Sequence, residues 1–309
     1  MDLAHARREA RSERDWARAD QLKAAIEAAG WTVVDRGVDF ELRPTIPPDV
    51  IRDGVVRYGA SASVPSTIGE AATLRSSIVL VGLLSSAERP PVADIEVEML
   101  VVVEGDAAAD IGAVEVVRTA TRFSPGAARN AGLRRTRGET VVLVDATAPF
   151  GRPEDDHPGP PVVEPVALLR WLSDGGLDSI EAGLADPTVA VVGLTAYRSD
   201  DLRRFVPGGG GEPIAVGGPV VGFRRPDIEM RGPLDERLLT PGAVDIAWSL
   251  TLRDDGASAP PRRAVLLDPG PHLATVPIDP DARLPRRDAY RLAEQFADRR
   301  HLLVASPAD

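Results

Sequence analysis

The sequence predicts an α/β protein with a mostly parallel sheet and flanking helices, preceded by a small α+β segment. Apolar runs rich in valine recur from residue 76 onward, and such runs are typical of strands that are covered on both faces. Helix-like stretches separate these runs, and alternation of strands with helices favours a parallel sheet. The first 43 residues differ, because helical spacing of apolar residues gives way there to strict alternation.

The N-terminal segment, residues 1–43, is expected to hold a helix or helical hairpin followed by a β-hairpin. Helical spacing over residues 2–29 is carried by Leu3, Ala6, Ala10, Ala19, Leu22 and Ile26. Gly30 follows where a C-cap is expected. The segments WTVVD and FELRP then alternate around an Arg36-Gly37 turn, which predicts two short paired strands.

Residues 44–75 read as a linker that wraps on the next domain, because four prolines interrupt any regular pattern. These prolines are Pro44, Pro47, Pro48 and Pro65. Residues 76–309 are then expected to form the main domain, which closes with a helix in DAYRLAEQFADRRHLL.

Within the main domain, four strands are predicted with helices between them. The strands are SSIVLVGLL, VEMLVVVEGD, ETVVLVDA and TVAVVGLTA; the helices are AARNAGLRRTRG, VEPVALLRWLSDG and SIEAGLADP. In open α/β sheets, ligands bind at the carboxyl ends of the strands. Glu104, Asp106 and Asp145 fall at such ends, so we expect a binding site there.

Composition narrows the class of protein. The chain has 309 residues, 43% hydrophobic and 27% charged, with a formal net charge of −11, which argues against general attraction to nucleic acid or anionic lipid. It has no cysteine, so disulfides and thiolate-bound zinc are excluded. The longest apolar run, residues 78–84, is far shorter than the ~20 residues of a membrane-spanning helix. The charged N-terminus lacks the apolar centre of a secretory signal, so we expect a cytoplasmic protein.

Three segments, in order, resemble family 2 glycosyltransferases of the GT-A fold. They are SPGAARNAGLRRTRGETVVLVDA, IAVGGPVVGFRRPDIEMRGPLDERL and VDIAWSLTLRDDG. With the two preceding strands, they cover about residues 76–275. The resemblance implies a Rossmann-like GT-A domain that binds a nucleotide sugar and transfers its sugar.

The resemblance also implies roles for particular residues. Those implied to contact the nucleotide are Glu104, Asp106, Arg129, Asn130 and Asp145. Those implied to lie on the acceptor side are Asp235, Glu236 and Trp248. Asp145 and His272 would bind a divalent cation, Mn²⁺ or Mg²⁺, that bridges the phosphates. Asp245 would be the remaining candidate for a general base.

The sequence departs from the family pattern at both chemical positions. Thr147 stands where the second metal carboxylate is usual, and Gly242 and Ala243 stand where the usual base would be. A full metal site is therefore in doubt, and two hypotheses stay open. The chain is a glycosyltransferase with altered metal dependence, or it is an inactive GT-A domain, a pseudoenzyme, used for binding or as a scaffold.

Structural explanations compete with these roles. The pattern favours capping and pairing within the helix for Arg129 and Asn130, a place in the core for Trp248, and a structural contact for His272. The glycines of residues 208–211 lack the strand, lysine and following helix of a phosphate-binding P-loop, so that segment is interpreted as a flexible loop.

The N-terminal segment resembles the C-terminal helical tail of cysteinyl-tRNA synthetases. The matching positions are Ala10, Arg11, Asp15, Trp16, Ala19, Asp20, Gly30, Val33 and Asp35. The resemblance covers about 40 residues and nothing of a synthetase's catalytic body, so aminoacylation is excluded. The resemblance of this helical tail motivates a third, weaker hypothesis, an RNA-associated accessory role. The arginines of the first helix alternate with acidic residues, which favours a solvated helix face instead. The sequence names no protein partner.

Overall fold

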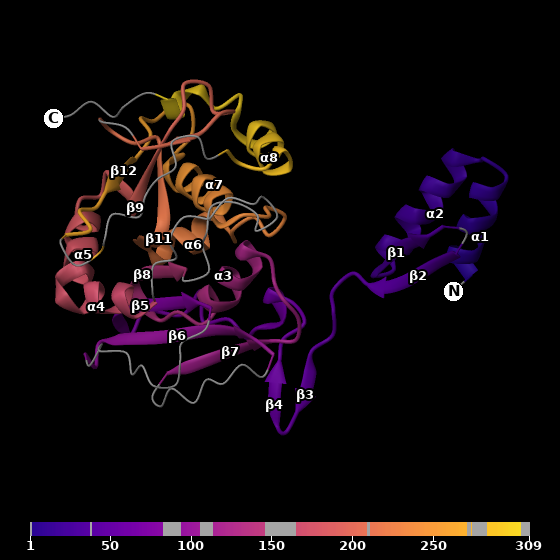
Figure 1. The fold of residues 1–309 in the computed structure, drawn as a ribbon, viewed down its shortest axis with the longest axis horizontal. Helices are drawn as coiled ribbons and strands as arrows, with labels where there is room; N and C mark the ends of the chain where they lie inside the picture. The colour runs from indigo at the N-terminus through magenta and orange to yellow at the C-terminus, as the bar shows by residue number, and fades with distance from the viewer. Residues whose placement is uncertain are drawn as a thin grey trace, which may run out of the picture.

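The computed structural model describes residues 2–37, 39–82, 94–105, 114–145, 165–208, 211–270, 273 and 283–303. The chain begins with two helices and a hairpin, which Figure 1 shows beside the main sheet, joined to it by one extended segment. These elements are α1 (Asp2–Ser12), α2 (Trp16–Ala28), β1 (Trp31–Arg36) and β2 (Asp39–Pro44).

The predicted helical stretch is a helical hairpin, because the chain reverses between α1 and α2. Arg14 has a φ of 62°, and Asp15 caps α2 by accepting a hydrogen bond from the Arg18 amide at 3.0 Å. Gly30 follows Ala29, the C-cap of α2, and adopts a φ of +82°, a conformation that favours glycine. Arg7 of α1 donates to Asp35 of β1 at 2.7 Å, which joins the helices to the hairpin.

The segment after this hairpin carries a two-stranded ribbon and a short 3₁₀ turn. They are β3 (Val50–Arg52), β4 (Val55–Arg57) and η1 (Ser61–Ser63). Beyond the ribbon the chain packs on the main domain, because Val64 is fully buried in its core and Arg225 donates to the carbonyls of Thr67 and Glu70.

The main sheet has eight strands among the described residues, in the order β10-β9-β11-β8-β5-β6-β7, with β12 also paired to β9. The strands are β5 (Leu74–Val81), β6 (Val97–Glu104), β7 (Glu115–Thr119), β8 (Gly138–Asp145), β9 (Val189–Arg198), β10 (Val206–Pro207), β11 (Ala215–Arg224) and β12 (Arg263–Leu266). Four pairings are parallel: β5–β6, β5–β8, β6–β7 and β9–β12. Strand β11 runs antiparallel to both β8 and β9.

Helices cover both faces of this sheet. They are α3 (Pro125–Leu133), α4 (Pro165–Trp171), the π-helical turn η2 (Leu172–Gly176), α5 (Leu177–Ala185), α6 (Arg225–Arg231), α7 (Pro241–Arg253), α8 (Arg286–Phe296) and η3 (Arg300–Leu303). One core cluster joins α3, α7 and α8 to the sheet, and the other joins α4 and α5 to its opposite face. Alternate residues of β5, such as Ile78 and Val79, enter different clusters. The predicted α/β fold class, a central and mostly parallel sheet with flanking helices, is therefore confirmed.

No helix in the described part of the chain combines the length and apolar character needed to cross a membrane.

Candidate functional site

The carboxyl ends of the parallel strands meet at one edge of the sheet, as the sequence predicts. Val81 at the end of β5 pairs with Asp145 of β8 and with Val102 of β6. Glu104, two residues beyond Val102, therefore extends past the same edge and is exposed. Asp145 differs from it, because only 4% of its surface is exposed.

Helix α3 brings Arg129 and Asn130 to this edge. Ser124 caps the helix by accepting a hydrogen bond from the Ala127 amide at 3.2 Å, and Pro125 occupies the first turn, where no amide hydrogen is required. Gly132 allows close packing on β5, because a Cβ there would lie 2.3 Å from a methyl carbon of Val79. The helix is consequently buried along its whole length, and its polar side chains must find partners inside the protein.

Arg129 bridges the two carboxylates on which the candidate chemistry depends. Its Nη2 lies 3.0 Å from Oδ2 of Asp145, and its Nη1 lies 2.6 Å from Oδ1 of Asp245. All three side chains are almost completely buried, with 1 to 3% of each exposed. We call this group of Arg129, Asp145 and Asp245 the buried triad. The sequence placed these residues in one site, and the structure shows that they contact one another directly.

Two glycines of β11 allow α7 to bring Asp245 into the triad. A Cβ at Gly217 would lie 2.5 Å from the Cβ of Asp245, so a side chain there would push the helix away. The amide of Gly218 donates to Oδ2 of Asp245 at 3.0 Å. Gly218 has a φ of +100° and lies where the pairing of β11 with β9 shifts register. Both oxygens of Asp245 therefore accept a hydrogen bond from within the protein.

The charges of the triad act differently on its members. Arg129 loses water on burial but faces two carboxylates, and its pKa is raised, so it stays positively charged. Burial raises the pKa of Asp245 to about 6, and the charge of Asp145 adds to the rise. Arg129 and the Gly218 amide oppose that rise without cancelling it, because desolvation penalises a fully buried carboxylate strongly.

Asn130 and the two acidic residues of the predicted acceptor side contact other parts of the protein. Asn130 donates to the Leu234 carbonyl at 2.9 Å and to Oε1 of Glu236 at 2.8 Å, and its own Oδ1 accepts from the Leu234 amide at 2.9 Å. Ser61 also donates to Glu236. Asp235 forms an ion pair with Arg291 of α8. These side chains therefore fasten the turn before α7.

The other predicted site residues do not join the triad. Trp248 lies in the core with 3% of its surface exposed, and its ring meets Phe223 edge to face at a centroid distance of 5.5 Å. The side chain of Glu104 has no hydrogen bond or ion pair among the described residues. Asp106 and His272, like Thr147, lie outside the described residues.

The described residues do not fit a divalent cation of the kind that the resemblance implies. Mn²⁺ and Mg²⁺ require several oxygen ligands, usually including a carboxylate that is free to coordinate. Asp145 is instead paired with a guanidinium, which places a positive charge beside the carboxylate where a cation would bind. Among the described residues, no group of three or more His, Cys, Asp or Glu side chains could hold a metal ion.

Sequence reasoning missed Tyr197, which ends the buried part of β9. Only 1% of its surface is exposed, and burial raises the pKa of its hydroxyl well above the ordinary value, with the charge of Asp245 contributing. The phenol therefore remains protonated beside the triad. A tyrosine near the end of a predicted buried strand was the only signal in the sequence, and it does not reveal which carboxylate lies near.

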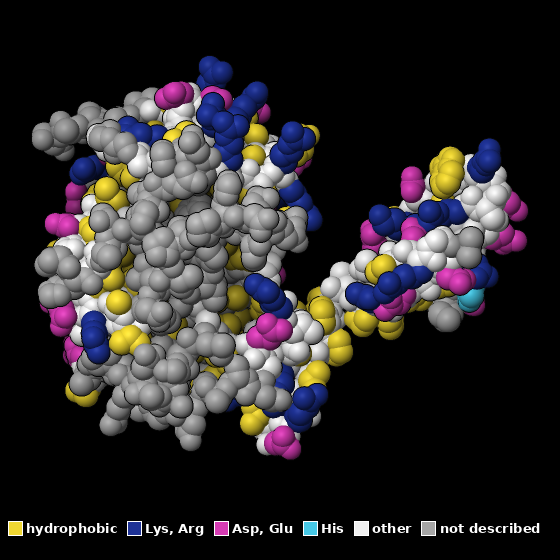
Figure 2. Space-filling model, in the orientation of Figure 1, with side chains coloured by type: hydrophobic (Ala, Val, Ile, Leu, Met, Phe, Trp, Pro, Cys, Tyr) yellow, Lys and Arg dark blue, Asp and Glu magenta, His cyan; other side chains and the backbone are white. Residues whose placement is uncertain are grey.

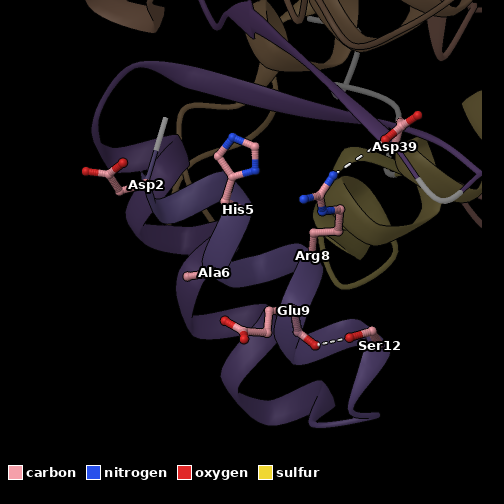
Figure 3. A pocket seen from close by; sticks show the side chains of 7 residues that line it. All are labelled: Asp2, His5, Ala6, Arg8, Glu9, Ser12 and Asp39. Carbon is pink, nitrogen blue, oxygen red and sulfur yellow. Dashed lines mark hydrogen bonds and ion pairs between the residues drawn. The ribbon is translucent and has the colours of Figure 1, made fainter.

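A pocket with a volume of about 780 Å³ on the N-terminal helices is a weaker candidate for a site. It is lined by Asp2, His5, Ala6, Arg8, Glu9, Ser12 and Asp39 (Figure 3). Some of its polar groups already have partners, since Arg8 lies 3.5 Å from Asp39 and the Ser12 hydroxyl donates to the Glu9 carbonyl at 2.7 Å. His5 packs edge-on against Phe40.

No protein-family model matches the chain, and no curated protein matches it. Among solved structures, it is similar to the mannosyltransferase PcManGT from Pyrobaculum calidifontis in complex with GDP-Man and Mn²⁺, at 16% identity and a TM-score of 0.37. That match covers 78% of this chain and 66% of the other. It is also similar to GalNAc-T7 with UDP, GalNAc and Mn²⁺, at 12% identity and a TM-score of 0.40. That match covers 72% of this chain and 48% of the other. The chain thus spans just under two thirds and about half of their lengths, and TM-scores below 0.5 support no function for it.

Proposed function

We propose that the chain is a GT-A-like, glycosyltransferase-related domain that no longer transfers sugar through a metal-dependent site and works as a binding or scaffold module. The ordered resemblance of its three segments supports the relation to glycosyltransferases. The observation that carries the loss of transfer is the buried triad, in which Arg129 engages both Asp145 and Asp245.

Sugar transfer needs a metal ligand and a general base, and in the buried triad the carboxylates that would serve, Asp145 and Asp245, are already paired with Arg129. Departure of a nucleoside diphosphate is usually assisted by a cation that neutralises the phosphates, whereas Asp145 is neutralised by Arg129. Activation of an acceptor hydroxyl needs a base within hydrogen-bond reach, whereas both oxygens of Asp245 already accept hydrogen bonds. Loss of a positioned base alone typically costs about 10²- to 10⁴-fold in rate.

A second candidate function is slow transfer with Asp245 as the base. The observation in its favour is that burial raises the pKa of Asp245 to about 6, and a base with a pKa near the working pH is efficient. In this case the triad would have to open, so that Asp245 exchanges Arg129 for the acceptor hydroxyl.

Binding and turnover assays separate the two candidates. The purified chain would be titrated with UDP, GDP and dTDP, with and without Mn²⁺, and then assayed for hydrolysis and transfer of the corresponding nucleotide sugars. Asp145→Asn and Asp245→Asn would be compared with Asp200→Asn, which changes an exposed carboxylate. We expect turnover at background in all four proteins and no gain in nucleotide affinity from Mn²⁺. Robust wild-type transfer that both triad variants abolish would overturn the proposal and support the second candidate.

The N-terminal unit supports no nucleic-acid partner. Positive and negative side chains are interleaved on the face of this unit that Figure 2 shows, and several pair with each other, as do Arg11 with Asp35 and Lys23 with Glu27. We therefore propose that residues 1–43 are a separately folded α+β unit with a solvated surface, and that the synthetase-like helical pattern serves a structural purpose.

A further inference from the structure

Arg198, the last residue of β9, has a guanidinium without a partner in the described part of the chain. Its Nε and Nη2 atoms are both buried, and neither has a hydrogen-bond acceptor there. No ion pair of Arg198 with a described carboxylate occurs either. A buried N–H group without an acceptor costs free energy, and more so when the group is charged. An arginine held in this state therefore points to a ligand that supplies the missing acceptors.

The fold holds Arg198 firmly in position. Strand β10 pairs with the end of β9 on one side, with Val206 opposite Arg198, and the Gly208 amide donates to the Ala196 carbonyl at 2.9 Å. On the other side, the Ile214 amide donates to the Tyr197 carbonyl at 2.9 Å. The strand end is thus hydrogen-bonded from both sides, which orders the backbone that carries the guanidinium.

Gly211 lies directly beside the guanidinium of Arg198. Its φ is +92°, and a Cβ on it would lie 3.2 Å from Nη2 of Arg198 and 3.6 Å from Nη1. The guanidinium therefore lies against the glycine backbone, and a side chain at position 211 would crowd it. Glycine is often found where a ligand and the backbone approach each other closely.

The neighbouring charges favour an anion. Arg203 and Arg204 follow in the same connection and are exposed. Asp201 is occupied by the amides of both arginines, at 2.9 and 3.0 Å. Glu212, the acidic residue next to Gly211, is paired with Arg263 at 3.1 Å. Asp201 and Glu212 thus have other partners and Asp200 is exposed, while three arginines are close in sequence.

We propose that Arg198 is the anchor of a binding site for a phosphate-type oxyanion. Its planar fork of donors matches the oxygens of a phosphate group. The place in the fold agrees, because Val221 of β11 pairs with Leu143 of β8 and with Gly193 of β9. Strands β8 and β9 therefore end at the same edge of the sheet, where ligands of α/β proteins bind. The site does not depend on whether the domain transfers sugar, since the oxyanion alone is recognised.

The test uses the full chain and inorganic pyrophosphate as the probe, with inorganic phosphate, UDP and uridine as further arms. Binding is measured by calorimetry and by the shift of the melting temperature. We expect pyrophosphate to bind the wild type and uridine to have no effect. We expect Arg198→Gln to weaken pyrophosphate binding by about tenfold or more, since a charge-assisted pair is lost. Arg170→Gln, a control that changes an exposed arginine of α4, should change the affinity by less than about threefold.

The melting temperature without ligand distinguishes a binding role from a structural one. Arg198→Gln removes a buried charge that has no partner, so its melting temperature should equal or exceed that of the wild type. UDP binding as strong as pyrophosphate binding would show that phosphates alone are read, and much stronger UDP binding would show that the nucleoside adds contacts; Arg198 anchors the anion in both cases. The proposal is overturned if the wild type binds no pyrophosphate, or if Arg198→Gln binds it as the wild type does. Neither result bears on the transfer assays.

Discussion

Nη1 of Arg129 donates a hydrogen bond to Oδ1 of Asp245 at 2.6 Å, across a sequence separation of 116 residues. This contact joins α3 to α7 in a region where both side chains are buried. In the resemblance to glycosyltransferases, the arginine belongs to the nucleotide side and the aspartate to the acceptor side. Their direct contact therefore connects two halves of a site between which substrates would have to bind.

Replacing Arg129 with methionine is expected to destabilise the protein by about 3–5 kcal/mol, because two buried carboxylates would lose their common counter-ion. Unfolding in urea at pH 7 measures this change. Arg263→Met is the control, since it breaks the Arg263–Glu212 pair, whose side chains are 42% and 25% exposed, and should cost less than about 1 kcal/mol. Adding Asp145→Asn and Asp245→Asn to Arg129→Met should restore most of the loss. A loss that persists in the triple variant would mean that packing, and not charge, explains the effect.

Asp245 should make the protein less stable as the pH rises from about 4 to 6. Its pKa is raised from 3.8 to about 6 in the folded state, so between these values the folded protein binds more protons than the unfolded chain. The free energy of unfolding then falls with rising pH, by at most about 1.4 kcal/mol per pH unit. Asp245→Asn removes this dependence and should be at its most stable, relative to the wild type, at pH 7. Urea unfolding at four pH values checks it, with Asp200→Asn as control. A wild-type-to-variant difference that does not change with pH contradicts the prediction.

Asp288 of α8 caps the start of α7 from a distance. Its carboxylate is fully buried and accepts from the amides of Leu239 and Thr240, at 2.9 and 3.0 Å, and from the Thr240 hydroxyl at 2.8 Å. Asp288→Ala would leave these donors without acceptors, so we expect a loss of about 2–4 kcal/mol in thermal or urea unfolding. Asp298→Ala, an exposed change near the end of the same helix, should stay within about 0.5 kcal/mol of the wild type. Equal effects of the two would show that the cap contributes nothing.

The chain should be cleavable between the N-terminal unit and the main domain. Residues 43–50 are all exposed, whereas Val64 is buried in the core of the main domain. Thermolysin, which cuts before large apolar residues that proline does not follow, should cleave at Ile51, whose surface is 74% exposed. A fragment that begins there should keep the cooperative unfolding of the main domain. Loss of that transition after the cut would mean that the N-terminal unit is part of the same folding unit.

The pattern of apolar residues predicted most of the elements that the structure contains. Continuous valine-rich runs became β5, β6, β8 and β9, because strands buried on both faces need no polar alternation. Alternation in WTVVD and FELRP predicted the hairpin β1–β2, because strands that are covered on only one face alternate apolar and polar residues. The reversal at Arg14 was harder to predict, because helical spacing continues through it and only the capping contact of Asp15 marks the break.

Strand-end position let the sequence place Asp145 at the edge of the sheet where a binding site was expected, and motif order let it assign Asp245 to the same expected site. Both inferences use local information, since strand ends and motif spacing are written along the chain. The contact of both carboxylates with Arg129 could not be inferred from such local information. It depends on the close approach that Gly217 permits, where a Cβ would lie 2.5 Å from the Cβ of Asp245, and on the burial of three charges in one small volume. In an open cleft, water would have solvated these three charged groups separately. The tertiary structure excludes water from them, and Arg129 therefore becomes the partner of both carboxylates.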